Sequence, residues 1–263
     1  GRVSDPPLLV CGEQMLIECA LNGGRTRAEH PGIPYTPQEL ADSAREAVAA
    51  GAGAVHFHVR GRDGRESLDA DDVARAVETV RAAIPATPFG VSTGAWIVPD
   101  VKTRHQKVAA WQVLPPFASI NFNEEGGVAL AELLLSRGVG LEAGVGSPQA
   151  VEALVASGLA DTCLRVMFEP EQQDLQAALD VVDRLEKMLD RGGVRIPRLL
   201  HGLNQTAWGL MDEALKRGYD TRIGFEDVVT LPDGRQAPSN TALVAGAMRR
   251  SRQSAKTKST TDG

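Results

Sequence analysis

The chain has 263 residues, of which 43% are hydrophobic and 24% are charged, and its formal net charge is -6. This composition is typical of a folded globular protein with a sizeable core, and it excludes disorder over most of the chain. The negative net charge argues against general nucleic-acid binding, which depends on basic patches that neutralise phosphates.

Residues 1–15 precede the first predicted strand and are expected to form an N-terminal extension. They lack the long apolar region of a signal peptide, and no part of the chain approaches the ~18 consecutive apolar residues of a membrane span. Cys11, Cys19 and Cys163 lack the C-x-x-C spacing of a zinc or redox motif, so they suggest a reducing compartment. We therefore expect a cytoplasmic protein with no membrane partner.

The first predicted helix has an unusually complete start signal. Thr36 is expected as the N-cap, Pro37 as the first helical position, and Glu39 as the residue that closes a capping box. The helix should end at Gly51, and a strand follows. The same order of helix, glycine and short apolar strand recurs at SRGVGLEAGV, ASGLADTCLRVMF and KRGYDTRIGF. This repetition is typical of βα units.

Segments with the pattern of strands recur along most of the chain: 16–21, 54–59, 88–92, 118–122, 140–144, 163–168, 198–202 and 221–225. Helical patterns lie between most of them, although the third helix, 101–111, looks short. Alternating βα units of this number predict the α/β class and a single (β/α)8 TIM barrel over residues 16–248, which agrees with the ~250 residues of such barrels. The remaining residues, 249–263, are polar, basic and aperiodic, and are expected to form a flexible tail.

The run AVHFHVR, residues 54–60, places two histidines two residues apart in a strand-like segment. Strand alternation puts His56 and His58 on one face and the apolar Val55, Phe57 and Val59 on the other. Two imidazoles at this spacing can bind one metal ion, because neutral imidazole is a common zinc ligand. A polar strand face with two unrelated histidines fits the same pattern, so a third ligand has to decide.

Alternation in the other strands also separates polar from apolar side chains. The apolar set should meet the outer helices, so the polar set faces the barrel axis, where unpaired charge is costly. Residues late in the strands lie at the C-terminal mouth, where barrel enzymes keep their sites. The candidates there are His56, His58, Ser92, Asn121, Glu142, His201, Arg222, Glu226 and Asp227. Among these, His56, His58 and Glu226 could form an open two-histidine, one-carboxylate site that suits catalytic zinc.

Some of these residues have other interpretations. His201 could be a polar strand end, and Glu142 could be an internal salt-bridge partner of Arg165 or Arg222. Loop or helix-surface positions are expected for His30 and His105, and packing roles for Trp96, Trp111 and Trp208.

The sequence resembles the beta-keto acid cleavage enzyme family from Leu16 to about Met248. The segments that carry the resemblance are ALNGGRT, PYTPQELADSA, AGAGAVHFHVR, VSTGAW, GLEAGV and RIGFEDVVTLPDG. The last of these, combined with H-x-H-x-R, is a specific pairing. The resemblance implies a (β/α)8 barrel that binds a divalent metal, usually zinc, and that forms oligomers, typically homotetramers.

The resemblance also implies a reaction in which a beta-keto acid and acetyl-CoA give acetoacetate and a new acyl-CoA. Carried over by position, the metal ligands would be His56, His58 and Glu226. The acid/base residue would be Asp227, and the other residues of the catalytic group would be Arg222, which assists it, and Ser92. The residues expected to bind substrate are Asn22, Arg25, Asn121, Glu142 and His201.

One departure from the family concerns the substrate. The members that act on 3-keto-5-aminohexanoate have an acidic residue just after a T-G-A motif on the first strand, which would suit an ammonium group. Here N-G-G is followed by Arg25. We expect a neutral or anionic substrate tail, because Arg25 would repel an ammonium group in a desolvated pocket.

Two other functions fit parts of the pattern. A metal-dependent hydrolase of amidohydrolase type also uses H-x-H on a barrel strand, but it normally needs further histidines on later strands, and only His201 is available. A non-catalytic metal-binding or ligand-binding protein would have little reason to place an acid, a base and a metal site in one mouth. Turnover that depends on acetyl-CoA separates these functions.

Overall fold

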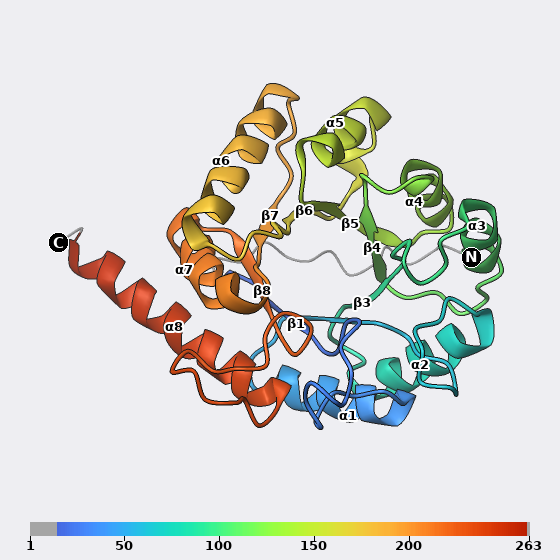
Figure 1. Ribbon diagram of the computed structural model, residues 1–263, viewed down its shortest axis with the longest axis horizontal. Helices are drawn as coiled ribbons and strands as arrows, with labels where there is room; N and C mark the ends of the chain where they lie inside the picture. The colour runs from blue at the N-terminus through green and yellow to red at the C-terminus, as the bar shows by residue number, and fades with distance from the viewer. Residues whose placement is uncertain (1–14, 262–263) are drawn as a thin grey trace.

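The computed structural model describes residues 15–261, with side chains described as far as residue 254. Within this range parallel strands form a closed barrel in sequence order, in which the last strand pairs with the first (Figure 1). The strands are β1 (Ile17–Ala20), β2 (Ala54–Phe57), β3 (Phe89–Ser92), β4 (Phe117–Asn121), β5 (Gly140–Val145), β6 (Arg165–Phe168), β7 (Arg198–Leu200) and β8 (Asp220–Ile223). The predicted (β/α)8 barrel is confirmed. The N-terminal extension expected at 1–15 lies almost wholly outside the described residues.

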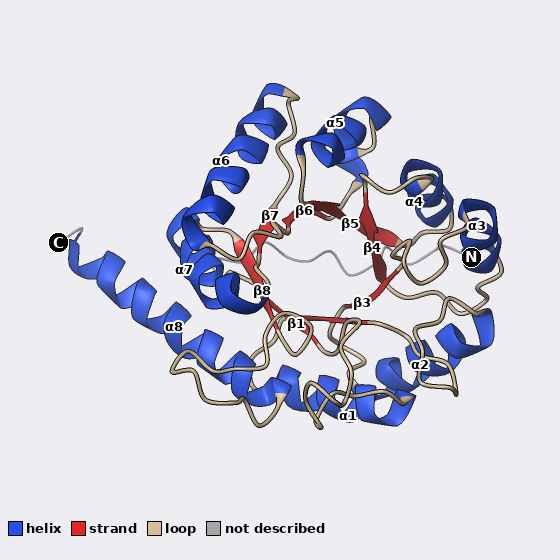
Figure 2. Cartoon of the chain, in the orientation of Figure 1, coloured by secondary structure: helices blue, strands red, loops and turns tan. Residues whose placement is uncertain are grey.

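Helices surround the barrel and alternate with its strands (Figure 2). They are α1 (Pro37–Ala49), α2 (Ala70–Ala83), α3 (Val101–Ala109), α4 (Gly127–Ser136), α5 (Pro148–Ser157), α6 (Leu175–Arg191), α7 (Ala207–Arg217) and α8 (Asn240–Thr261). The third helix is short, as expected. Within the described residues, no helix combines the length and apolar character needed to span a membrane.

The capping box predicted for α1 is present. The backbone N–H of Glu39 donates to Thr36 Oγ1 at 3.2 Å, and the backbone N–H of Thr36 donates to Glu39 Oε2 at 2.9 Å. The glycines predicted to end later helices have positive φ, with values of 77° at Gly138, 70° at Gly158 and 73° at Gly218. Left-handed backbone of this kind favours glycine, so these turns explain the repeated helix, glycine, strand pattern.

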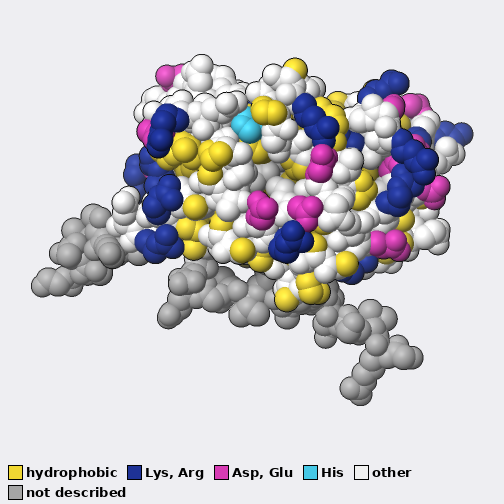
Figure 3. All heavy atoms as spheres, turned by 90° about the horizontal axis from the view of Figure 1, so that it is seen from below, with side chains coloured by type: hydrophobic (Ala, Val, Ile, Leu, Met, Phe, Trp, Pro, Cys, Tyr) yellow, Lys and Arg dark blue, Asp and Glu magenta, His cyan; other side chains and the backbone are white. Residues whose placement is uncertain are grey.

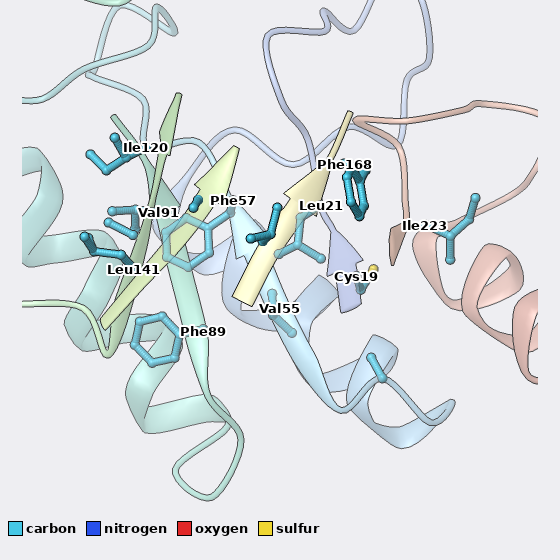
Figure 4. Packing of buried hydrophobic residues seen from close by; sticks show 14 of the residues in the cluster. Cys19, Leu21, Val55, Phe57, Phe89, Val91, Ile120, Leu141, Phe168 and Ile223 are labelled. Carbon is cyan, nitrogen blue, oxygen red and sulfur yellow. The ribbon is translucent and has the colours of Figure 1, made fainter. Parts of the chain in front are cut away.

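The hydrophobic core lies between the barrel and the helices. Apolar side chains from the strands, such as Val55, Phe57, Val91 and Leu141, are fully buried there (Figure 4). The rings of Phe57 and Phe89 stack with centroids 5.9 Å apart. The outward face of each strand is therefore the apolar one, as the alternation predicted.

Two similar hairpins follow β2 and β8. Isolated antiparallel bridges join Arg60 to Glu66 and Thr230 to Gln236. Each hairpin turns at an Asp-Gly pair whose glycine has positive φ, 80° at Gly64 and 83° at residue 234. Each hairpin follows the candidate metal ligands of its segment in the sequence, His58 in the first case and Glu226 in the second.

The C-terminal segment differs from the expectation. Residues 249–263 were expected to form a flexible polar tail, but α8 continues as a helix to Thr261 and extends beyond α7 (Figure 1). Helix was not predicted there because the segment lacks apolar periodicity. Whether it moves as a separate tail stays a prediction.

The surface of one side of the molecule carries mixed charge. Lys and Arg side chains gather toward two sides of the face drawn in Figure 3, with Asp and Glu side chains between and beside them. Opposite charges therefore stand close together on this face.

A cluster of charged side chains lies inside the barrel, near the starts of β1, β6 and β8. Arg165 on β6 donates from Nε to Glu142 Oε1 at 2.7 Å, and its Nη atoms lie 3.3 Å from Asp220 Oδ2 and 3.5 Å from Glu18 Oε2. Arg165, Glu142 and Glu18 are fully buried or nearly so. Barrel interiors are normally apolar, and unpaired charges there are costly. These side chains are tolerated because opposite charges lie next to each other.

We predict that Arg165→Met lowers the free energy of unfolding by about 3–5 kcal/mol, because it leaves buried carboxylates without their cation. Urea denaturation followed by circular dichroism measures this. The control is Arg235→Met, which removes an exposed partner of Asp233 and should leave the midpoint unchanged. Equal midpoints for the two variants would contradict the prediction.

Candidate functional site

Three predicted metal ligands converge at the C-terminal mouth of the barrel. His56 lies on β2, His58 follows its last residue, and Glu226 lies in the turn after β8. Glu226 Oε2 is 3.7 Å from His56 Nε2, and Glu226 Oε1 is 3.4 Å from His58 Nε2. Two donors bound to one zinc ion at ~2.1 Å with tetrahedral angles would be about 3.4 Å apart. The donor set and its spacing therefore fit a single divalent metal with open positions.

The approach of β8 to β1 requires glycine at two positions. A Cβ on Gly224 would lie 1.9 Å from the carbonyl oxygen of Ala20, and one on Gly23, whose φ is 55°, would lie 2.4 Å from Glu226 Cγ. The backbone N–H of Glu226 donates to that same Ala20 oxygen at 3.2 Å. The eighth strand was predicted over 221–225 with Glu226 at its end, but β8 ends at Ile223 and a turn brings Glu226 to the mouth.

Arg222 joins the two neighbouring carboxylates. Its Nη2 donates to Asp227 Oδ1 at 2.7 Å and to Glu226 Oε1 at 3.1 Å. Asp227 is fully buried, and its Oδ2 has no hydrogen-bond partner among the described residues. Burial opposes charge on Glu226, but Arg222 and the two histidines hold the pKa of Glu226 well below its usual value. Asp227 thus presents one free carboxylate oxygen beside the metal-ligand cluster.

The two histidines differ in charge. Burial lowers the pKa of His56 to about 4, despite the nearby Glu226. Burial also opposes charge on His58, but the carboxylates of Glu226 and Glu66 outweigh it and raise the pKa of His58 to about 9. In the metal-free chain at neutral pH, His56 is neutral and His58 is protonated.

A second group of possible ligand atoms lies deeper. Atoms of Glu18, His56 and Glu142 fall within 4.8 Å of one another. Burial and the neighbouring Glu142 raise the pKa of Glu18 well above its usual value, while Arg165 holds Glu142 in its charged form. The raised pKa of Glu18 makes it a poorer metal ligand than Glu226, whose pKa is lowered, so the cluster nearer the mouth is the better metal site.

Two residues predicted to bind substrate also have structural partners. Asn22 donates to the carbonyl oxygens of Pro34 and His58 and accepts from the backbone N–H of His58 at 2.8 Å, so its amide holds the His58 backbone in place. Glu142 is the salt-bridge partner of Arg165, the other interpretation of this residue. Both side chains are fully buried.

The other predicted site residues stand around the mouth. Arg25 donates from Nε to the carbonyl oxygen of Glu226 at 3.1 Å and pairs with Glu29. His201 Nδ1 is 3.4 Å from Asp227 Oδ1. Ser92 ends β3, and its Oγ accepts from the backbone N–H of the nearby Gly94 at 3.4 Å.

The polar ends of the Asn121 and Glu169 side chains both lie against Gly144. A Cβ on Gly144 would lie 2.5 Å from both Asn121 Oδ1 and Glu169 Oε1. Glu169 Oε2 is also 3.9 Å from His201 Nε2. The glycine that follows Glu142 by two residues therefore makes room for these two polar side chains.

Glu66 and Glu169 were not predicted from the sequence, and the expected packing role of Trp96 was wrong. Glu66 contacts His58, and Trp96 is exposed and stacks on the His58 ring with centroids 6.0 Å apart, although a packing role was expected. His30 lies in a loop, one of the two positions expected for it, and its ring is buried against Phe225. The one available signal was the Asp-Gly turn at 63–64, which folds Glu66 back toward His58.

Comparisons with known proteins agree with the geometry. The model of the beta-keto acid cleavage enzyme family matches residues 14–262. A 3-keto-5-aminohexanoate cleavage enzyme from Fusobacterium nucleatum subsp. nucleatum is 26% identical over 254 residues, covering 90% of this chain and 91% of that protein. A 3-oxoadipate:acetyl-CoA acetyltransferase from Cupriavidus necator is 38% identical over 80 residues, 30% of this chain and 28% of that protein.

Among solved structures, the chain is similar to ObcA without ligand. The TM-score is 0.65 at 19% identity, and the match covers 83% of this chain. It spans 61% of ObcA, so this chain corresponds to about three fifths of that protein. At this identity the likeness supports the barrel fold alone.

We predict that metal binding near pH 7 releases about one proton. The pKa of His58 is raised to about 9, so the metal must displace a proton from this imidazole. The apparent affinity should therefore rise about tenfold per pH unit until the pH passes about 9. Calorimetry in buffers of different ionisation enthalpy measures the proton count. An affinity that does not change over this range would contradict the charge assigned to His58.

Proposed function

The chain belongs to the beta-keto acid cleavage enzyme family, and from this premise we propose that it converts a beta-keto acid and acetyl-CoA into acetoacetate and a new acyl-CoA with a divalent metal. The observation that supports this most directly is the contact of Arg222 with both Glu226 and Asp227. That contact holds Asp227, the proposed acid/base residue, beside Glu226, a proposed metal ligand. In the proposed reaction the deprotonated CH₂ attacks the acetyl carbonyl and the CoA thiolate leaves. The CoA sulfur then bonds to the keto carbon while the bond between that carbon and the CH₂ breaks, and the released acetoacetate carbanion takes back a proton.

Asp227 is the proposed acid/base residue. The CH₂ of a beta-keto acid lies between two carbonyl groups, and loss of its proton gives the carbon nucleophile that the reaction needs. The free Oδ2 of Asp227 is the proposed proton acceptor, while Arg222 donates to Oδ1. His201, 3.4 Å from the same Oδ1, helps to fix the orientation of this carboxylate.

His56, His58 and Glu226 would hold the metal. Their donor spacing supports this assignment, and zinc is the proposed ion because it favours nitrogen and carboxylate ligands. When bound, the metal supplies a Lewis acid that stabilises negative charge on the keto oxygen. A homotetramer and a cytoplasmic location are proposed on the resemblance to the family.

Arg25 is proposed to disfavour a cationic substrate tail. It is attached to the turn that carries Glu226 and Asp227, where its guanidinium donates to both backbone carbonyls. Its partner Glu29 is more exposed than Arg25, so within this ion pair the positive charge lies nearer the barrel and the negative charge nearer the solvent. An ammonium group brought close would be repelled.

The function is tested with a panel of beta-keto acids, each incubated with acetyl-CoA and the zinc-loaded protein. We expect acetoacetate and the matching acyl-CoA, formed only with both substrates, and fastest for neutral or acidic tails. Hydrolysis without acetyl-CoA would instead favour the amidohydrolase type. A rate highest with the amino-substituted acid would refute the role given to Arg25, but not the reaction.

A second prediction separates the two neighbouring carboxylates. Asp227→Asn keeps the size of the side chain but removes the basic oxygen, so turnover should fall about 10²-fold or more while metal stays bound. Glu226→Ala should lose metal and activity together. Metal analysis beside steady-state kinetics measures both. Near-normal turnover in Asp227→Asn, or metal loss as complete as in Glu226→Ala, would show that these roles are wrong.

A further inference from the structure

Glu66 is brought to the metal-ligand cluster by the hairpin after β2. The backbones of Arg60 and Glu66 form an antiparallel bridge, and the N–H of Ser67 donates to the carbonyl oxygen of Val59 at 2.9 Å. The turn of this hairpin contains Gly64, whose φ is 80°. A residue eight positions after His58 is thereby returned to its side, where its carboxylate is largely buried.

The two ring nitrogens of His58 face different carboxylates. Nδ1 is 2.5 Å from Glu66 Oε1, whereas Nε2 is 3.4 Å from Glu226 Oε1. A neutral imidazole carries one N–H, and a carboxylate at Nδ1 keeps that hydrogen on Nδ1. The lone pair is then on Nε2, directed toward Glu226. Histidines that bind metals commonly donate their other N–H to a carboxylate in this way, and the contact also increases their basicity.

Trp96 fixes the carboxylate of Glu66 from the other side. Its Nε1 is 3.2 Å from both carboxylate oxygens, and its ring stacks on the His58 ring at an interplanar angle of 26°. The indole ring lies against the backbone of Gly94, where a Cβ would be 2.2 Å from the ring. Glycine at position 94 therefore allows this position of the ring. Trp96 is a large hydrophobic side chain left 53% exposed, so core burial does not account for its position.

His56 has no equivalent arrangement. Its Nδ1 is buried and has no hydrogen-bond partner among the described residues. A carboxylate contact at Nδ1 is therefore found for His58 and not for His56. The carboxylate belongs to Glu66, which lies in the hairpin after β2 and not on a barrel strand.

We propose that Glu66 is a positioning residue that selects the metal-binding tautomer of His58, and that Trp96 holds Glu66 in place. The inference rests on the metal site proposed above. It adds that the affinity of this site is set partly by two residues that do not touch the metal.

The test measures zinc affinity by competition with a chromophoric chelator, in the full-length protein. Glu66→Ala should weaken binding about 10- to 100-fold. Glu66→Gln keeps an acceptor oxygen without the charge, so its loss should be smaller, and Trp96→Phe, which keeps the stacking but removes the donor, should show a smaller loss still. The matched control is Glu171→Gln, the same chemical change at an exposed residue of the β6–α6 loop, and it should bind zinc as the wild type does.

A second readout separates positioning from a general structural effect. The visible absorption of bound Co²⁺ reports the ligand field, so it should shift in the Glu66 variants and stay unchanged in Glu171→Gln. If Glu66→Ala does not fold, the nearly isosteric Glu66→Gln decides.

The outcomes distinguish this inference from the proposed function. Stoichiometric zinc in the wild type, lost in His56→Ala but bound normally by both Glu66 variants, would overturn the role of Glu66 and leave the metal site standing. Wild-type protein that binds no stoichiometric zinc would overturn both.

Discussion

Charge pairing inside the barrel is the constraint on which the rest of the structure depends. Arg165 and Arg222 both stand in an interior that barrels normally fill with apolar side chains, and carboxylates surround each of them. Desolvation of such ions costs several kcal/mol each unless partners and hydrogen bonds compensate. Because Arg222 serves both Glu226 and Asp227, neither carboxylate can move without disturbing the other. The position of the mouth residues follows from this shared cation.

The metal-ligand cluster has a charge balance of its own. His56 and His58 come from one strand face, yet burial dominates at His56, whereas Glu226 and Glu66 outweigh burial at His58. In the metal-free chain the proton on His58 supplies positive charge where a metal cation would supply it. The cluster is thus compensated with or without metal, which explains how carboxylates persist in so buried a place.

Local rules made much of this predictable. Strand alternation and parallel pairing are properties of short segments, so the sequence indicated the barrel and the convergence of His56, His58 and Glu226. The remaining features depend on where strands stop and how loops return. Glu66 was missed because a hairpin brings it back, and the structural role of the Asn22 amide was missed because its partners are backbone groups. The Asp-Gly turn at 63–64 is a sequence signal for the return of Glu66, whereas the backbone partners of Asn22 have no pattern in sequence.

The mouth is divided between different segments of the chain. Metal-ligand atoms come from the ends of β2 and β8, whereas Arg25, Asn121 and Glu169 are carried by the ends and loops of β1, β4 and β6. Loops on a rigid barrel tolerate change more readily than its strands. The side chains carried by loops can therefore be exchanged one loop at a time while the proposed metal ligands keep their places at the strand ends.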